Sequence, residues 1–294
     1  MIDKLKELED QIDQLATNLA GNFYQTIQVL GAVVSMQERY YEGSHSRFVS
    51  QKSYEIAKEL GMSEESAYEV KIAGLLHDIG KIGFRDTLQQ KYTQEMTNAE
   101  YKQYMLHPEL GKQILSKHDG FSSIAEIVYQ HHERVDGSGF PRHLHDNEIV
   151  AGARIISVVD TYHNMMFKQK KDKTATSGST FKYSSTNQYL DSTHSRFGST
   201  MNYINMKSEV LFDKMVVEAF IENIELERKN IGKRTVMRLP IGKLVPGMTF
   251  AEDYFTSYGL LVAANGEQTS EDNLKALIRL AEAGEVPQKI LVMR

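Results

Sequence analysis

The chain has 294 residues, of which 41% are apolar and 25% are charged, and its formal net charge is −5. This length favours about two domains with sizeable cores, and the composition is that of a globular rather than a disordered protein. No apolar run is long enough to span a bilayer, and the charged N-terminus lacks the apolar region of a signal peptide. We therefore expect a cytoplasmic protein that does not enter the membrane. The negative charge disfavours a nucleic-acid polymer as partner.

The chain contains no cysteine but ten histidines. The absence of cysteine excludes disulfides, thiolate metal sites, iron–sulfur clusters and cysteine nucleophiles. Any metal must therefore be bound by imidazole and carboxylate groups, a donor set that suits iron, manganese, zinc or nickel.

The N-terminal segment, residues 1–30, is predicted to be a coiled-coil or signalling helix. Its apolar residues follow the 3-4-3-4 spacing of a heptad repeat: Leu5, Leu8, Ile12, Leu15 and Leu19. We favour a parallel homodimer through this helix, the alternative being a helix packed on its own domain. The apolar pattern continues, so one helix could extend to about residue 39 and connect the chain to an upstream sensor or signalling protein.

Residues 31–232 are predicted to form a helical domain. Gly61 is a helix C-cap signal, and Thr97 with Glu100 forms a capping box. Pro108 suits the first turn of a helix, and Asn147 is expected to cap a helix that runs through Met166. The Ser/Thr/Tyr/Asn-rich residues 168–208 are expected to be a flexible inserted surface segment, with a lid over a site as the alternative.

The remaining residues, 233–294, are predicted to form a small β-rich domain with a structural role. Short strands are expected at 236–239, 248–251, 259–263 and 290–293, and a helix capped by Ser270 at 270–283. The predicted fold class is mainly α, with an N-terminal helix and a small C-terminal α+β appendage.

Ionisable residues interrupt the apolar faces of four predicted helices. His45, His77, His131 and Asp160 each lie on the stripe of residues that helical periodicity assigns to the core. A buried imidazole or carboxylate must be paired or must bind something. A single such histidine is most often a hydrogen-bonded core residue, but four stripes of this kind favour a metal site.

Three further ligand-type residues adjoin this set, namely Asp78, His132 and His107. Seven ligands exceed the usual protein share of one metal ion but suit two ions that share a bridging carboxylate, for which Asp78 is our candidate. Two-metal centres of this kind catalyse phosphoryl displacement. The residues alone therefore favour a dinuclear metallohydrolase.

The motifs around these residues resemble the HD-GYP branch of the HD phosphohydrolase superfamily, which are phosphodiesterases of bacterial cyclic dinucleotides. The similarity covers about residues 30–166, resumes at 211–224, and implies an HD-type helical bundle. The matching text is His45-Ser46-Arg47, His77-Asp78-Ile79-Gly80-Lys81, His107-Pro108-Glu109, His131-His132-Glu133-Arg134 with Asp136-Gly137-Ser138-Gly139-Phe140-Pro141, and Ala153-Arg154-Ile155-Ile156 with Asp160.

The resemblance implies roles for individual residues. His45, His77, Asp78 and Asp160 would bind one ion, and Asp78, His107, His131 and His132 the other. Lys81 would hold the scissile phosphate, which makes Asp78 and Lys81 the catalytic residues; the alternative for Lys81 is a solvated helix-end lysine. Gly139, Phe140 and Pro141 would border the substrate, or else form a purely structural turn.

Three positions depart from the family pattern. Phe140 replaces the tyrosine that gives the family its name. Tyr41 stands where some relatives carry a glutamate that supports a third metal, so three ions are possible but two are favoured. The substrate-binding stretch expected after Asp160 is absent; Lys168, Lys170 and Lys171 are candidates to replace it, the alternative being a solvated charge run.

The function implied is hydrolysis of a cyclic dinucleotide, cyclic di-GMP first, to a linear dinucleotide and further to GMP, with two divalent ions, iron or manganese. Four alternatives stay open: cyclic GMP–AMP as substrate, a catalytically weak cyclic-dinucleotide receptor, an HD phosphohydrolase of another nucleotide, and a diiron HD enzyme that acts on an oxidisable substrate. His163 is a weak candidate for the group that protonates the leaving oxygen.

Overall fold

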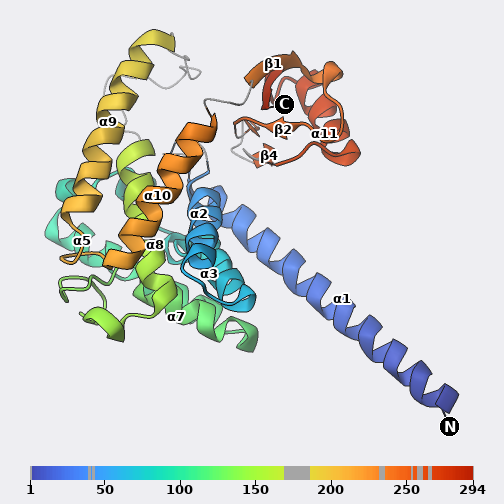
Figure 1. Cartoon of the computed structure of the whole chain (residues 1–294), viewed down its shortest axis with the longest axis horizontal. Coiled ribbons are helices and arrows are strands. Elements are labelled where there is room, and N and C mark those ends of the chain that lie inside the picture. Colours follow the sequence, from blue (N-terminus) through green and yellow to red (C-terminus); the bar gives the residue numbers. More distant parts are fainter. Residues whose placement is uncertain are drawn as a thin grey trace.

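The computed structural model describes residues 2–38, 41, 44–168, 186–231, 236–252, 254–256, 261–263 and 267–293. These residues are mainly helical, as predicted (Figure 1). The α-helices are α1 (Ile2–Ser35), α2 (His45–Glu59), α3 (Glu64–Leu76), α4 (Asp86–Gln89), α5 (Asn98–Tyr104), α6 (His107–Leu115), α7 (Ser122–Gln130), α8 (Ala151–Phe167), α9 (Thr186–Met206), α10 (Lys214–Ile231) and α11 (Glu271–Glu282). Single 3-10 turns lie at η1 (Ile79–Lys81), η2 (Thr93–Glu95), η3 (Asp119–Phe121), η4 (Asp146–Glu148) and η5 (Ile241–Lys243).

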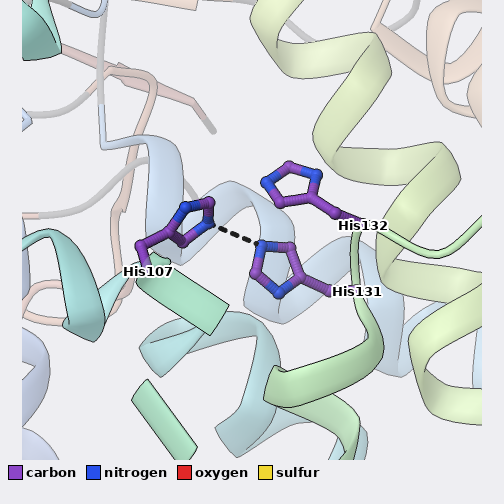
Figure 2. Close-up of side chains that lie close together, drawn as sticks. All are labelled: His107, His131 and His132. Atoms are coloured by element: carbon purple, nitrogen blue, oxygen red, sulfur yellow. Dashed lines mark hydrogen bonds between the residues drawn. The ribbon is translucent and has the colours of Figure 1, made fainter. Parts of the chain in front are cut away.

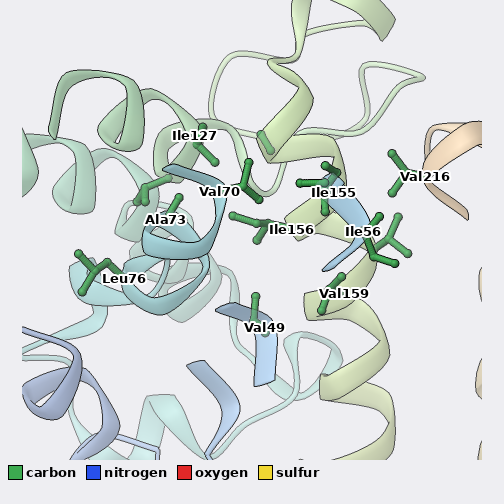
Figure 3. Close-up of a cluster of buried hydrophobic side chains, with 14 of the residues drawn as sticks. Val49, Ile56, Val70, Ala73, Leu76, Ile127, Ile155, Ile156, Val159 and Val216 are labelled. Atoms are coloured by element: carbon green, nitrogen blue, oxygen red, sulfur yellow. The ribbon is translucent and has the colours of Figure 1, made fainter. Parts of the chain in front are cut away.

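The main core lies where the predicted apolar stripes of α2, α3, α7 and α8 meet (Figure 3). Val49, Ile56, Val70 and Ile156 are completely buried there. The residues that continue the same stripes, among them Asp160, are therefore carried into the interior by packing that the apolar residues already stabilise.

Most predicted helix ends are confirmed, and one is wrong. The N–H of Gly61, at φ +77°, donates to the Lys58 carbonyl after α2, and Thr97 caps α5 through a capping box. Asn147 does not cap the next helix, because α8 begins only at Ala151. The Glu148 carboxylate accepts the N–H of His145 and closes the separate turn η4, after which the chain is extended.

The prediction for the second half of the inserted segment is also wrong. We expected residues 168–208 to be a flexible surface segment, but α9 spans Thr186–Met206 and packs on α8. Phe197, Met201 and Ile204 supply the contact at helical spacing within an otherwise polar text. Apolar contacts of this kind stabilise a helix that its own sequence would not. Residues 169–185 lie outside the described part of the chain.

Helix α1 has two parts of different character. Phe23, Ile27, Leu30 and Val34 pack against the main core, whereas the preceding turns project away from it (Figure 1). In the projecting part Ile12 and Leu15 are 64% and 74% exposed. Pairing of this face with a second copy stays a prediction. No helix in the described part of the chain is both long and apolar enough for a membrane span.

The C-terminal residues form a second, smaller core. Strand β5 (Lys289–Met293) lies between β1 (Val236–Pro240) and β2 (Thr249–Phe250), and both pairings are antiparallel. Strands β3 (Tyr254–Phe255) and β4 (Leu261–Ala263) form a separate hairpin, and Ser270 caps α11 as predicted. Of these elements only β3 was not predicted.

The close packing of η1 against α6 generates a stability prediction. A Cβ at Gly80 would overlap the carbonyl oxygen of His107, a backbone atom that cannot rotate away. Gly80→Ala is therefore expected to lower the free energy of unfolding by about 2 kcal/mol or more. In the control Gly198→Ala, on α9, the added Cβ meets nothing within 4 Å, and stability should stay equal or rise slightly. Urea denaturation measures both, and equal effects would contradict the prediction.

Candidate metal centre

The seven predicted ligands come together in the interior of the helical domain. His45 is the first residue of α2, His77 and Asp78 follow α3, and His107 is the first residue of α6. His131 and His132 follow α7, and Asp160 lies within α8. Six of them are buried and Asp78 is nearly so, with 11% of its side chain exposed.

One ligand group contains His45, His77, Asp78 and Asp160. The Nε2 atom of His45 lies 3.2 Å from Nε2 of His77 and 3.2 Å from Oδ1 of Asp160. The same Asp160 oxygen lies 3.6 Å from Nε2 of His77, and Oδ2 of Asp78 lies 3.9 Å from Nε2 of His45. His45, His77 and Asp78 lie close enough together to hold a metal ion, and the Asp160 oxygen lies beside both histidines.

The second ligand group contains His107, His131 and His132, whose rings face one another (Figure 2). The Nε2 atoms of His107 and His131 are 3.2 Å apart. The ring of His132 lies edge-on to that of His107, with centroids 4.8 Å apart. Three imidazoles and a carboxylate suit borderline divalent ions such as iron and manganese.

Asp78 lies between the two groups. Its Oδ1 atom is 3.5 Å from Nε2 of His77 in the first group and 3.5 Å from Nε2 of His107 in the second. This buried oxygen has no hydrogen-bond partner among the described residues. A buried carboxylate oxygen left without a donor is costly, and a metal ion on each side would satisfy it. The donor set therefore fits metal binding, with Asp78 between the two groups of donors.

Helix ends set the orientation of three ligand rings. The Nδ1–H groups of His77, His107 and His131 donate to the carbonyls of Gly74, Tyr104 and Val128, each three residues earlier, at 2.8, 2.7 and 2.6 Å. These carbonyls lie in the last turns of α3, α5 and α7, where no backbone N–H is available to them. Each histidine therefore caps a helix with one nitrogen and directs the other, Nε2, inward.

His45 is oriented by a side chain instead. Its Nδ1 lies 3.0 Å from Nδ1 of His163, which is buried beside Phe48 and Phe167. Burial lowers the pKa of His163 well below its ordinary value. The structure places His163 against His45, and its role as a proton donor stays a prediction.

The two groups differ in their protonation. Burial lowers the pKa of His77, but Asp78 and Asp160 outweigh it and raise the value to about 9. In the second group burial lowers the pKa of His131 to about 3 and that of His107 and His132 well below the ordinary value. Burial raises the pKa of Asp78, but His77 and Lys81 together hold it well below its usual range.

A pocket adjoins Asp78 and carries two lysines. It is lined by Asp78, Lys81, Tyr41, Tyr104 and Lys168, with residues of α1 and of the 84–96 segment. The Nζ of Lys81 donates to Oδ2 of Asp78 at 2.6 Å. Burial and the neighbouring Lys81 lower the pKa of Lys168 to about 8, and its Nζ donates to the Lys91 carbonyl at 3.0 Å. Lys81 and Lys168 thus both line this pocket. Lys170 and Lys171, the other two predicted lysines, lie outside the described residues.

The loop Gly139-Phe140-Pro141 packs against the turn that carries His132. A Cβ at Gly139 would overlap backbone atoms of that turn, and the Phe140 ring stacks on His132 with centroids 4.7 Å apart. The buried carboxylate of Glu133 accepts the N–H groups of Arg142 and Leu144, at 2.6 and 3.0 Å, and fixes the end of the loop. Phe140 therefore borders the second ligand group.

Three supporting residues near the centre were not predicted. Asn164 donates to Oδ1 of Asp160 at 2.6 Å and accepts the hydroxyl hydrogen of Tyr41 at 2.8 Å. Glu38 accepts the N–H of Ser46 beside His45 at 2.7 Å, and Tyr104 lies 3.1 Å from His132. Asn164 follows Asp160 by one helical turn, so this contact could have been predicted from spacing. The contacts of Glu38 with Ser46 and of Tyr104 with His132 depend on tertiary packing.

Removing two ligands of the first group tests the metal assignment. The double variant His77→Ala, Asp78→Ala is expected to abolish metal binding, because it removes the bridging carboxylate together with one imidazole. Metal per chain is measured by elemental analysis of protein purified without oxygen, and circular dichroism checks that the variant is folded. His143→Asn, which changes an exposed histidine, is the control. Full metal content in the double variant would refute the assignment.

Because the two ligand groups differ in protonation, we expect their metal affinities to depend differently on pH. With its pKa near 9, His77 carries a proton at pH 7 that a metal ion must displace. The affinity of the first group should therefore rise by about tenfold from pH 7 to pH 8. The metal affinity of the second group, whose histidines are already neutral, should change little over the same pH range.

Competition with a chelating indicator measures both affinities. His131→Ala isolates the first group, and His77→Ala isolates the second. Equal slopes with pH in the two variants would contradict the prediction.

Comparison with known proteins indicates the family to which the chain is similar. The family model described as HD domain matches residues 28–193. Among curated proteins, a cyclic di-GMP phosphodiesterase of Thermotoga maritima is 33% identical over 168 residues, which are 56% of this chain and 45% of that protein. A 3′3′-cGAMP-specific phosphodiesterase of Vibrio cholerae is 32% identical over 46% of this chain and 29% of that protein.

A cyclic di-GMP phosphodiesterase response regulator of Xanthomonas campestris is 35% identical over 43% of this chain and 35% of that protein. The chain spans less than half the length of these relatives. The region matched by the family model is more than half of the chain and contains all seven ligands of the metal centre. The chain belongs to the HD domain family.

Proposed function

We propose that this protein is a metal-dependent phosphodiesterase of the HD-GYP type that hydrolyses a cyclic dinucleotide, with cyclic di-GMP as the first candidate and cyclic GMP–AMP as the second. The observation that carries the proposal is Asp78, an ionised carboxylate with one unsatisfied oxygen between two groups of ligands and a lysine on its other oxygen. The relatives named as phosphodiesterases of both nucleotides support the substrate class.

The cofactor that we propose is a pair of divalent ions, iron or manganese. His45, His77 and Asp160 would hold one, His107, His131 and His132 the other, and Asp78 both. When bound, the ions lower the pKa of a water so that it can attack phosphorus, and they neutralise charge on the phosphate. Tyr41 argues against a third ion, because its ring stacks on His45 and its hydroxyl donates to Asn164.

Lys81 is proposed to stabilise the transition state. Its Nζ is held beside the metal-binding carboxylate by the short hydrogen bond to Asp78, and it lines the adjoining pocket. In this partly buried position its charge would act on a phosphate oxygen in a low dielectric, where such an interaction is strong. Lys168 gives the same pocket a second cationic group, which suits a substrate with two phosphates.

The proposed roles of Gly139, Phe140 and Pro141 follow from the packed loop. Gly139 brings the loop against the backbone of the ligand turn, and this places the Phe140 ring over His132. An aromatic face at this edge of the centre is suited to stacking with a base. Pro141 follows in the same loop and completes the border of the substrate site.

Assays with a substrate panel test the function. Manganese- or iron-loaded protein is incubated with cyclic di-GMP, cyclic GMP–AMP and cyclic di-AMP, and linear products are measured by chromatography. Lys81→Met is expected to lower kcat/KM for the preferred nucleotide by about 10²–10³-fold, while the metal content stays as in the wild type. Lys102→Met, at an exposed lysine, is the control and should not change kcat/KM.

Two outcomes would contradict the proposal. Metal-loaded protein that binds a cyclic dinucleotide without cleaving it would be a receptor rather than an enzyme. Full activity in Lys81→Met would show that Asp78 and the ions act without the lysine.

A further inference from the structure

Tyr104 is a residue that no motif singles out, yet it contacts two ligands of the second group. It is the last residue of α5 and precedes His107 by three positions. Its carbonyl accepts the Nδ1–H of His107 at 2.7 Å, and its hydroxyl oxygen lies 3.1 Å from Nε2 of His132. One contact is made by the backbone and the other by the side chain, so the two can be separated by substitution.

Packing fixes the position of the phenol ring. The ring lies against His107 with centroids 4.9 Å apart and edge-on to Phe140 at 6.1 Å. The Nζ of Lys81 lies 5.2 Å from its centroid. Tyr104 also lines the pocket that contains Asp78, Lys81 and Lys168. Its hydroxyl is therefore held at the boundary between the second ligand group and the pocket.

The partner of the hydroxyl must change when a metal ion binds. A neutral imidazole has one ring nitrogen with a lone pair, and the nitrogen of His132 that faces Tyr104 is Nε2. An ion that takes this lone pair leaves the phenol O–H without its acceptor. The released donor then lies next to the ion, where an anionic oxygen bound to that ion would come within its reach.

We propose that Tyr104 is a substrate-contacting residue whose hydroxyl donates a hydrogen bond to a phosphate oxygen held at the second ligand group. The inference rests on the proposed function for the identity of the substrate, a phosphodiester. It rests on the described contacts for the position of the donor. In this arrangement Lys81 contacts the phosphate from the side of Asp78 and Tyr104 from the side of His132.

A purely structural role for the hydroxyl makes a different prediction. If the hydroxyl only oriented His132, its loss would weaken metal binding at the second group. If it contacts the phosphate, its loss leaves the ion in place, because Phe140 and the loop still hold the His132 ring. Metal content and phosphate affinity together therefore separate the two roles.

The experiment uses the full chain loaded with manganese and the variant Tyr104→Phe. Tyr101→Phe is the matched control, since Tyr101 lies on the same helix with its ring 6.3 Å from that of Tyr104 and its side chain is exposed. Three quantities are measured: metal per chain, the dissociation constant of inorganic phosphate by calorimetry, and kcat/KM for cyclic di-GMP.

For Tyr104→Phe we expect unchanged metal content, phosphate affinity about tenfold weaker, and kcat/KM about ten- to a hundredfold lower, since one hydrogen bond to a charged acceptor is lost. Tyr101→Phe should match the wild type. Loss of metal from Tyr104→Phe, or unchanged phosphate affinity, would overturn the inference.

The result also separates this inference from the proposed function. If the wild-type protein cleaves no cyclic dinucleotide but Tyr104→Phe still binds phosphate more weakly, the proposed substrate is wrong and the Tyr104 contact stands. If the wild type cleaves cyclic di-GMP and the variant cleaves it and binds phosphate equally well, the Tyr104 contact is wrong and the function stands.

Discussion

The carboxylate of Asp78 is the constraint on which the rest of the centre depends. It is ionised in an interior where an unpaired charge is very unfavourable, and its neighbours compensate for it: Lys81 on one oxygen and His77 beside the other. Because the compensation for Oδ1 is incomplete among the described residues, the folded chain presents a site with a strong preference for cations.

Helix ends solve the problem of holding several histidines in fixed orientations. His77, His107 and His131 lie at or just beyond the final turns of α3, α5 and α7, where carbonyls need donors. The bond that each ring makes to such a carbonyl satisfies the helix and fixes the ring at once. These three rings are thus oriented by the backbone, whereas His45 lies against another side chain, that of His163.

The parts of this structure that could be predicted from sequence are those set by periodicity. Asp160 occupies a position that the stripe of Ala153 and Ile156 assigns to the core, so its burial follows from spacing alone. The N-terminus of α8 was misplaced because Asn147 is an intrinsically good cap, and a competing turn closed by Glu148 is visible only in three dimensions. Helix α9 was missed because a few apolar residues fold a polar segment once α8 provides a surface, and Tyr104 because its contact with His132 spans 28 residues.

The projecting helix α1 has a mechanical consequence for the centre. At 1.5 Å per residue its 34 residues form a rod about 50 Å long, and only the last part, from Phe23 to Val34, is packed on the core. The rod ends close to Glu38, whose carboxylate accepts the N–H of Ser46. Ser46 lies in the first turn of α2, beside His45. The free arm is thus joined, through the packed part of α1, to the segment that holds the first turn of α2 and His45.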